Sequence, residues 1–297
     1  MKLPSHDRYD YIPLAERRDY NWPNGARLAV CFCNNIEHFA FGAGLGSDSA
    51  VLNSPQNQRN YAWRDYGNRV GLWYLFDLFD ELGVPASHNV NSAVFEHCPA
   101  IAERIRARGD EVVGHGRTNA ERQNALWEAD EARLIAECTE ILIRTMGKRP
   151  DGWLGPYLAQ SNVTLDLLKE AGYGYVMDWP FDDQPVWMRT RAGPILSVPY
   201  PIEINDSPAL VFRQHSGREF ADMIVDQFDE MLEQSRKWPL VCGISLHPFI
   251  VGQPFRLRQL RQAMRHILQR RDALWVTTPG EIARYCAALP PGTVPGS

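Results

Sequence analysis

Residues 111–119 read EVVGHGRTN, a short apolar run that stops at His115 and continues through a glycine into polar residues. In an α/β protein, a strand that ends on a histidine and leads into a glycine-containing loop places that imidazole at the rim where substrates bind. Four residues further on stands Asn119, where a second metal-binding histidine would share the same face. The segment therefore predicts an α/β fold with His115 at its active rim, and the chemistry depends on what His115 works with.

Apolar runs typical of strands alternate with amphipathic helical runs along the rest of the chain. We expect strands near residues 27–35, 86–90, 111–114, 152–154, 175–177, 195–198, 241–246 and 274–276. We expect helices near residues 70–82, 99–108, 130–146, 164–171, 218–236, 258–271 and from 278 onward. This alternation predicts a mainly parallel sheet covered by helices, and the seven or eight strands favour a distorted (β/α) barrel over an open sheet.

The composition does not change along the chain in a way that would separate two domains. We expect a single barrel domain over residues 27–290, an aromatic, proline-containing N-terminal arm over 1–26 and a tail over 291–297. Residues 38–66 are rich in glycine, serine and asparagine, and a loop of this length in a compact domain is usually functional or disordered. A lid or a contact between subunits is favoured by its aromatic residues, Phe39, Phe41, Tyr61 and Trp63.

Composition and charge exclude several classes of protein. A net charge of -5 offers no basic surface for nucleic acid or anionic membrane, so we expect neither as a partner. No apolar run approaches the ~20 residues that span a bilayer, and the first residues lack the apolar core of a signal peptide. The six cysteines lie in apolar segments, which is typical of buried thiols in a reducing compartment. We therefore expect a cytoplasmic protein.

Polar side chains collect just after the predicted strands, and in a barrel these positions share one mouth. Along the chain they are Asn35, Glu37, His38, Asn89, Asn91, His115, Asn119, Trp153, Asp178, Trp179 and His247. A single histidine at a strand end is often satisfied by a backbone carbonyl, and a tryptophan there can be a core residue. Two histidines together with Glu37 and Asp178 at one rim indicate an active site.

Several short motifs occur in an order that a known family shares. They are an acid near residue 37, the polar motif opened by His115, GWLGP at 152–156, Asp178, and LHP at 246–248. This order resembles the polysaccharide deacetylase (NodB-like) superfamily. NIE at 35–37, DDQPVW at 182–187, VPYPIEIND at 198–206 and HPFIVGQPFR at 247–256 are similar to motifs of its cofactor-independent allantoinase and cyclic-imide hydrolase branch. The resemblance implies a distorted barrel and hydrolysis of a carbon–nitrogen bond other than a peptide bond.

The resemblance also raises the question of a metal ion. Deacetylases of this superfamily hold a divalent metal, commonly zinc, with an aspartate and two histidines of an HxxxH-type motif, beside a second aspartate as base. Here the base position is Asn35, the ligand acid is Glu37 and the second histidine is Asn119, while DGWLGP lacks the arginine that supports the base. An amide oxygen is a poor zinc ligand. We therefore expect no cofactor; a divalent metal such as zinc, if present, would be held by Glu37, His115 and Asn119.

These residues and the resemblance together predict a metal-free amidohydrolase that opens a small cyclic ureide or imide. Glu37 with His115 would orient and deprotonate a water molecule, and His247 would protonate the leaving nitrogen, the role that the resemblance implies for it. Asp178 would orient an imidazole or bind a ring N–H. The expected substrate-binding residues are Asn35, Asn91, Asn119, Trp153 and Trp179.

Two other functions stay open. The first is a metal-dependent polysaccharide or N-acyl deacetylase, with Glu37, His115 and either Asn119 or His38 on the metal. The second is a catalytically silent barrel that binds a carbohydrate or a ureide. We expect a small-molecule substrate as the partner, and the arm, the 38–66 loop and the resemblance favour a homo-dimer or homo-tetramer.

Overall fold

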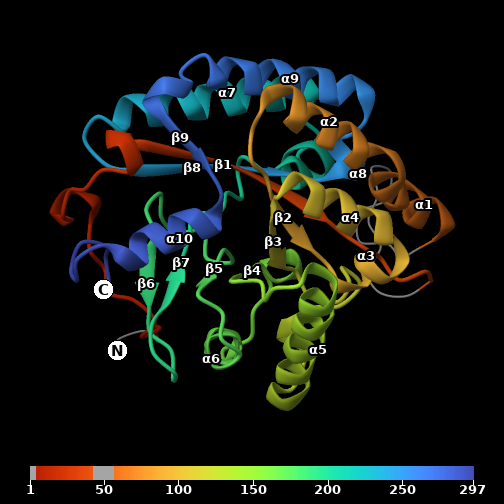
Figure 1. Cartoon of the computed structure of the whole chain (residues 1–297), viewed down its shortest axis with the longest axis horizontal. Helices are drawn as coiled ribbons and strands as arrows, with labels where there is room; N and C mark the ends of the chain where they lie inside the picture. The colour runs from red at the N-terminus through yellow and green to blue at the C-terminus, as the bar shows by residue number, and fades with distance from the viewer. Residues whose placement is uncertain (1–4, 43–56) are drawn as a thin grey trace.

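A curved, mainly parallel sheet forms the centre of the computed structural model, which describes residues 5–42 and 57–297 (Figure 1). Its strands are β1 Leu28–Ile36, β2 Ser87–Val90, β3 Glu111–Gly114, β4 Gly152–Trp153, β5 Tyr175–Val176, β6 Val186–Met188, β7 Ile195–Ser197, β8 Leu240–Leu246 and β9 Leu274–Thr277. Their order is β6-β7-β5-β4-β3-β2-β1-β8, with β9 paired to β1. Each of these pairings is parallel except that of β6 with β7. The predicted distorted (β/α) barrel is confirmed, with nine strands in the described residues.

Strand β1 is the centre of this sheet because it pairs with three others. On one edge, residues 28–31 pair with β9 and residues 33–36 pair with β2, while β8 runs along the other edge. All nine residues of β1 are buried, which is why the strand reads as an almost continuous apolar run. Its carboxyl end delivers Asn35 and, one residue past the strand, Glu37 to the barrel mouth.

Helices cover the outside of the sheet (Figure 1). They are α1 Gln58–Tyr66, α2 Leu72–Leu82, α3 Ser92–His97, α4 Pro99–Arg108, α5 Glu128–Met146, α6 Thr164–Glu170, α7 Gly217–Gln234, α8 Pro248–Val251, α9 Pro254–Leu268 and α10 Pro279–Ala288. A capping box between Ser216 and Glu219 fixes the start of α7. Helices α7 and α9 lie side by side over β1 and β8, where Phe228 and Met264 join the largest apolar cluster. No helix within the described residues has the length and apolar character needed to cross a bilayer.

The structure contains short elements that the pattern of apolar residues does not predict. Helix α1 falls within residues 38–66, expected as a loop, and has no apolar stripe: its buried residues are Asn60 and Arg64. The expected lid or subunit contact also involves residues 43–56, which lie outside the described residues. Elements β6, α3 and α8 span only three, six and four residues, too few for a periodicity to show.

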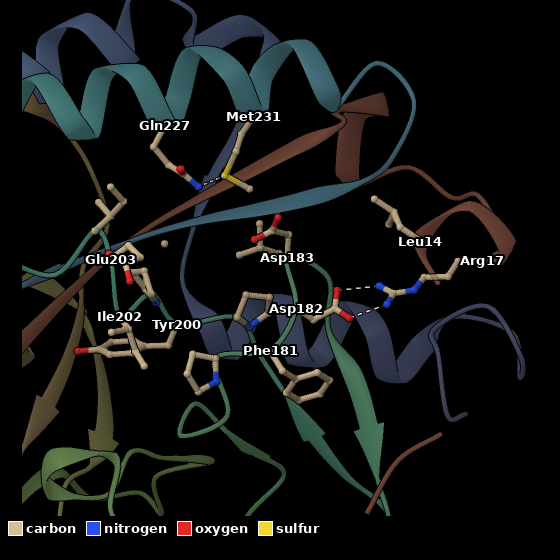
Figure 2. Close-up of a pocket in the computed structure, with 16 residues that line it drawn as sticks. Leu14, Arg17, Phe181, Asp182, Asp183, Tyr200, Ile202, Glu203, Gln227 and Met231 are labelled. Atoms are coloured by element: carbon tan, nitrogen blue, oxygen red, sulfur yellow. Dashed lines mark hydrogen bonds and ion pairs between the residues drawn. The ribbon is translucent and has the colours of Figure 1, made fainter. Parts of the chain in front are cut away.

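Between the edge strands β6 and β8 the barrel wall is completed by irregular chain that precedes β6 and follows β7. The backbone N–H of Val241 donates to the carbonyl of Asp183, and the N–H of Ser245 donates to that of Ile204. Outside this seam lies a groove of about 570 Å³, shown in Figure 2. There Arg17 of the N-terminal arm forms an ion pair of 2.6 Å with Asp182. The arm therefore contributes to closing the barrel.

The arm and the tail both pack on the barrel. Arg8 forms an ion pair of 2.8 Å with Asp166 in the first turn of α6, and the indole N–H of Trp22 donates to the carbonyl of Leu240 at 3.0 Å. In the tail, Val294 is buried, and the N–H of Trp187 in β6 donates to the carbonyl of Pro295. The division into arm, barrel and tail at residues 26 and 290 stays a prediction.

Candidate active site

Three ionisable side chains from three strand ends meet at the mouth of the barrel. Glu37 follows β1, His115 follows β3 and His247 follows β8. The Oε1 atom of Glu37 lies 3.5 Å from Nε2 of His115 and 3.6 Å from Nε2 of His247. All three side chains are buried. The structure thus brings together the three residues that we expected to carry the chemistry.

The tautomer of His115 follows from its backbone partner. Its Nδ1 lies 2.6 Å from the carbonyl oxygen of Leu154, so Nδ1 donates to this carbonyl, and Nε2 is the ring nitrogen that faces Glu37. Within the described residues this buried Nε2 has no hydrogen-bond partner. At the next position, Gly116 has φ of 64°, and a Cβ there would lie 2.9 Å from Pro156. The glycine therefore permits the sharp turn that leaves the imidazole at the strand end.

His247 is held from its other side by Asp206. The Nδ1 atom lies 2.6 Å from Oδ1 of Asp206, and the backbone N–H of His247 donates to Oδ2 at 2.7 Å. Burial alone would lower the pKa of His247, but the carboxylates of Asp206 and Glu37 outweigh it and raise the pKa to about 10. At neutral pH His247 is therefore an imidazolium, ready to act as an acid.

Glu37 is the charged partner of both imidazoles. Burial alone would raise its pKa, but the positive charge of His247 and the close approach of the two imidazoles lower the pKa of Glu37 to about 2. Glu37 is therefore ionised at neutral pH. A buried carboxylate between two histidines can stabilise positive charge on either ring during a reaction.

A chain of amides determines what Asn119 presents to Glu37. The backbone N–H of His38 donates to Oδ1 of Asn91 at 2.9 Å, and Nδ2 of Asn91 donates to the carbonyl of His115, which fixes the orientation of the Asn91 amide. That Nδ2 also donates to Oδ1 of Asn119 at 3.1 Å. The Nδ2 of Asn119 therefore faces Glu37 and donates to Oε1. Asn91, predicted to bind substrate, instead orients Asn119.

Asn35 is engaged at both ends of its amide. Its Nδ2 donates to the hydroxyls of Tyr200 and Ser245 and to the carbonyl of Leu246, at 3.0, 3.1 and 3.0 Å. Its Oδ1 accepts from Nδ2 of Asn89 at 2.9 Å. Although Asn35 borders the cavity, this network satisfies its amide within the protein, so the structure lends little support to its expected contact with substrate.

The three ionisable groups open into a cavity of about 270 Å³, the size expected for a small ligand. Most of its wall is aromatic or aliphatic. Besides Glu37, His115, His247, Asn35 and Asn119, the lining residues are Phe39, Trp63, Arg64, Leu154, Tyr157, Leu158, Tyr200, Ile202, Asn205, Ser207, Pro208, Val211, Phe212 and Phe249.

Besides Asn91, three predicted site residues do not line this cavity. Trp153 is fully buried and donates to Oε1 of Gln123 at 3.0 Å, and Trp179 donates to Oε1 of Gln160 at 2.8 Å. The two indoles therefore do not wall a substrate ring. Asp178 accepts from the N–H of Gly155 at 2.6 Å rather than from an imidazole, and burial raises its pKa to about 7. It lies behind the cavity wall.

The side chains at this mouth do not fit the divalent metal of the deacetylases. The ligand set expected for a metal, Glu37, His115 and Asn119, is not assembled, because Asn119 turns its amide nitrogen towards Glu37. In the part of the chain that the structure describes, no group of three or more His, Cys, Asp or Glu side chains is arranged to hold a metal ion. The chemistry below is derived from the protein's own side chains.

Comparison with known proteins relates the chain to a known family. Residues 61–176 match the polysaccharide deacetylase family. A protein of Schizosaccharomyces pombe named "Putative polysaccharide deacetylase" is 24% identical over 302 residues, which cover 91% of this chain and 93% of that protein.

Two crystal structures share the deacetylase fold over most of the chain. A probable polysaccharide deacetylase from Pseudomonas aeruginosa PAO1 is 27% identical, with a TM-score of 0.81 over 89% of this chain and 92% of that one. A PuuE allantoinase is 25% identical, with a TM-score of 0.85 over 98% of this chain and 99% of that one. The predicted class of hydrolases of carbon–nitrogen bonds other than peptide bonds is confirmed.

Asp206 is the main site residue that the sequence did not single out. It lies in no predicted element, and the only signal is the motif VPYPIEIND, which ends on this aspartate. The structure brings it to the mouth because Asn205 forms a parallel bridge with Ser245 of β8, two residues before His247. The aromatic wall from Trp63 and Phe249 was likewise not predicted as part of the site.

Proposed function

We propose that this protein opens the ring of a small cyclic ureide or imide by hydrolysis without a metal ion. The observation that carries the proposal is an arrangement of two histidines around Glu37: His115, whose Nε2 has no hydrogen-bond partner among the described residues and would act as the base, and a protonated His247. General acid–base catalysis of amide hydrolysis needs these two functions on the two sides of the scissile bond. The likeness to a PuuE allantoinase supports a cyclic ureide as the class of substrate.

In this mechanism, a water molecule held by Glu37 and His115 attacks the ring carbonyl carbon. Nε2 of His115 takes a proton from the water, and the carboxylate of Glu37, 3.5 Å away, stabilises the imidazolium that forms. The ring carbon–nitrogen bond then breaks, and Nε2 of His247 donates its proton to the leaving nitrogen. The product carries a new carboxyl group and an N–H. Proton exchange with solvent returns His115 to its neutral form and His247 to its protonated form.

The second candidate is a deacetylase of an N-acylated substrate, which the match of residues 61–176 favours. It would use the same His247 acid, but it would need a metal that the orientation of Asn119 does not favour. A silent binding barrel is the third, and it would have no use for a protonated histidine beside a buried carboxylate. Both alternatives are outcomes of the experiments below.

The first experiment is a panel of substrates. The protein, purified without added metal ions, is assayed with allantoin, hydantoin, succinimide and N-acetylglucosamine oligomers, and its metal content is measured. We expect turnover of a cyclic compound by protein that carries less than about 0.1 metal ion per chain. An enzyme that needs one metal ion at its site would carry about one per chain. Stoichiometric zinc or another divalent ion, with release of acetate from the sugars, would favour the deacetylase instead.

The acid role of His247 is tested by His247→Ala. Removing the proton donor should lower kcat by about 100-fold or more with a smaller change in KM, because the proton transfer is made in the transition state. The matched control is His266→Ala, which removes a histidine of α9 from its exposed pair with Asp229 of α7. His266→Ala should leave kcat unchanged. An unchanged kcat in His247→Ala would remove His247 from the chemistry.

Assembly and location are part of the same proposal. We propose a cytoplasmic homo-dimer or homo-tetramer acting on a small molecule, with no role for nucleic acid or membrane. In support, two large aromatic side chains are exposed in the single chain: Tyr11 of the arm at 88% and Trp127 before α5 at 83%. A second subunit would cover such side chains. Light scattering of the full chain measures the assembly, and a monomer at micromolar concentration would contradict it.

A further inference from the structure

An aromatic cluster adjoins the reacting groups inside the cavity. The ring centroids of Phe39 and Phe249 lie 6.3 Å apart at 82°, and those of Trp63 and Phe249 lie 4.9 Å apart at 89°. The ring of Phe249 in turn lies 5.8 Å from that of His247. A ring whose carbonyl lies at these reacting groups would therefore have this cluster beside it, within reach of a substituent on the ring carbon next to the attacked carbonyl.

The apolar surface continues around the cavity beyond these three rings. Val211 and Phe212 come from the π-helix Ser207–Phe212, and Ile202 comes from the chain that follows β7. Val211 is 6% exposed, whereas Phe212 and Ile202 are 47% and 44% exposed and lie towards solvent. The apolar wall thus runs from the reacting groups to the opening.

Several polar groups that line the cavity are already paired within the protein. The amide of Asn35 is held by Tyr200 and its neighbours, and Asn119 donates to Glu37. Oδ1 of Asn205 accepts from the N–H of Ser207 at 3.0 Å. The guanidinium of Arg64 lies 3.6 Å from the ring centroid of Phe39, against an aromatic face. A polar substituent would therefore lose its water and find few matched partners, because the amides of Asn35 and Asn119 and Oδ1 of Asn205 are already engaged.

From this arrangement we infer that the substrate's ring carries an apolar alkyl or aryl substituent, seated against Phe39, Trp63 and Phe249. The inference rests on the proposed ring-opening function and narrows its substrate class. Allantoin carries a ureido group, with three N–H groups and one carbonyl, at this position of the ring. A ureido group would place those polar groups against aromatic faces, whereas a phenyl or isopropyl group would bury apolar surface there.

The experiment compares kcat/KM for four hydantoins that differ only in the 5-substituent: none, isopropyl, phenyl and ureido, the last being allantoin. We expect the isopropyl and phenyl compounds to exceed hydantoin by about 10-fold or more, as a filled apolar pocket provides. Allantoin should fall below both. Racemic compounds are followed to completion, so that a preference for one enantiomer shows as a half-consumed substrate.

Two variants test whether the aromatic cluster causes this preference. Trp63→Ala should lower the ratio of kcat/KM for the phenyl compound to that for hydantoin by about 10-fold. Val211→Thr keeps the shape of the side chain and replaces one methyl group by a hydroxyl. It should lower the ratio of kcat/KM for the isopropyl compound to that for hydantoin, without loss of folding. The matched control, Tyr74→Ala, removes an exposed aromatic ring of α2 that lies outside the cavity and should change neither ratio.

The outcomes separate this inference from the function on which it rests. Turnover of allantoin above that of the apolar compounds would overturn the inference and leave ring opening in place. Ratios that stay unchanged in both Trp63→Ala and Val211→Thr would also overturn it. Hydrolysis of no hydantoin and no imide would overturn the proposed function, and the inference with it.

Discussion

His247 keeps its proton at neutral pH because two carboxylates face it inside the barrel. Asp206 holds Nδ1 at 2.6 Å, and Glu37 lies 3.6 Å from Nε2. The contact with Asp206 also fixes the ring, so that the second N–H points at the cavity. His115 differs because its Nδ1 partner is a neutral backbone carbonyl. The two histidines therefore take opposite roles, and the partner of each Nδ1 decides which.

The descending limb of the pH profile reports the proton on His247. As pH rises through about 10, the folded-state pKa of this group, His247 loses its proton and kcat/KM should fall. Asp206→Asn removes an opposite charge, which lowers the pKa of His247 and should move the limb to lower pH. A rate profile between pH 6 and 11 measures the limb. The control is Asp229→Asn, which removes the carboxylate from the exposed pair with His266. If Asp229→Asn moved the descending limb as far as Asp206→Asn does, the limb could not be assigned to His247.

The sequence identifies site residues that directly follow a strand, and it does not show which way their side chains point. Glu37, His115 and His247 were found in this way. Trp153 was misassigned because successive side chains of a strand point to opposite faces: Leu154 lines the cavity, and Trp153 therefore packs against the helices outside. Asp206 could not be found, because only the folded path of the irregular chain after β7 brings it to β8.

At the level of elements, the π-helix Gly67–Gly71 holds α8 in place. A Cβ at Gly71 would lie 2.1 Å from the carbonyl oxygen of Pro248, the first residue of α8. Helix α8 begins immediately after His247, so its position sets that of the catalytic imidazole. Long periodic helices such as α5 were predicted from the sequence, whereas this close contact between two short elements depends on tertiary packing that no local pattern records.

Gly71→Ala should therefore lower both stability and activity. A methyl group at an ordinary helix position stabilises by up to ~1 kcal/mol, but here overpacking against backbone should cost ~1–3 kcal/mol and displace α8. Thermal unfolding and kcat with the best cyclic substrate are the measurements. The control is Asp77→Ala at an exposed position of α2. Unchanged kcat in folded Gly71→Ala would show that α8 does not position His247.

At the level of the whole molecule, the barrel depends on its N-terminal arm for closure. Strand pairing ends at β8, and the irregular chain beyond it is held from outside by Arg17 through its ion pair with Asp182 (Figure 2). The guanidinium of Arg17 also donates to the carbonyl of Ile12 at 2.9 Å. The side chains of Arg17 and Asp182 are only 10% and 12% exposed. The alternation of strands and helices predicts the barrel class, but it does not predict that residues outside the alternation close the wall.

Arg17→Met tests this closure, because it keeps the apolar stem and leaves Asp182 without its partner. Loss of one member of a mostly buried pair should cost roughly 2–4 kcal/mol and lower Tm by several degrees. Arg189→Met, which removes an exposed pair between the same arm and the barrel, should change Tm little. Because the seam lies outside the catalytic cavity, kcat/KM at 25 °C should hold in both variants. Partial recovery of Tm in the double variant Arg17→Met/Asp182→Asn would assign the loss to the unpaired carboxylate. A wild-type Tm in Arg17→Met would instead show that the barrel closes without this contact from the arm.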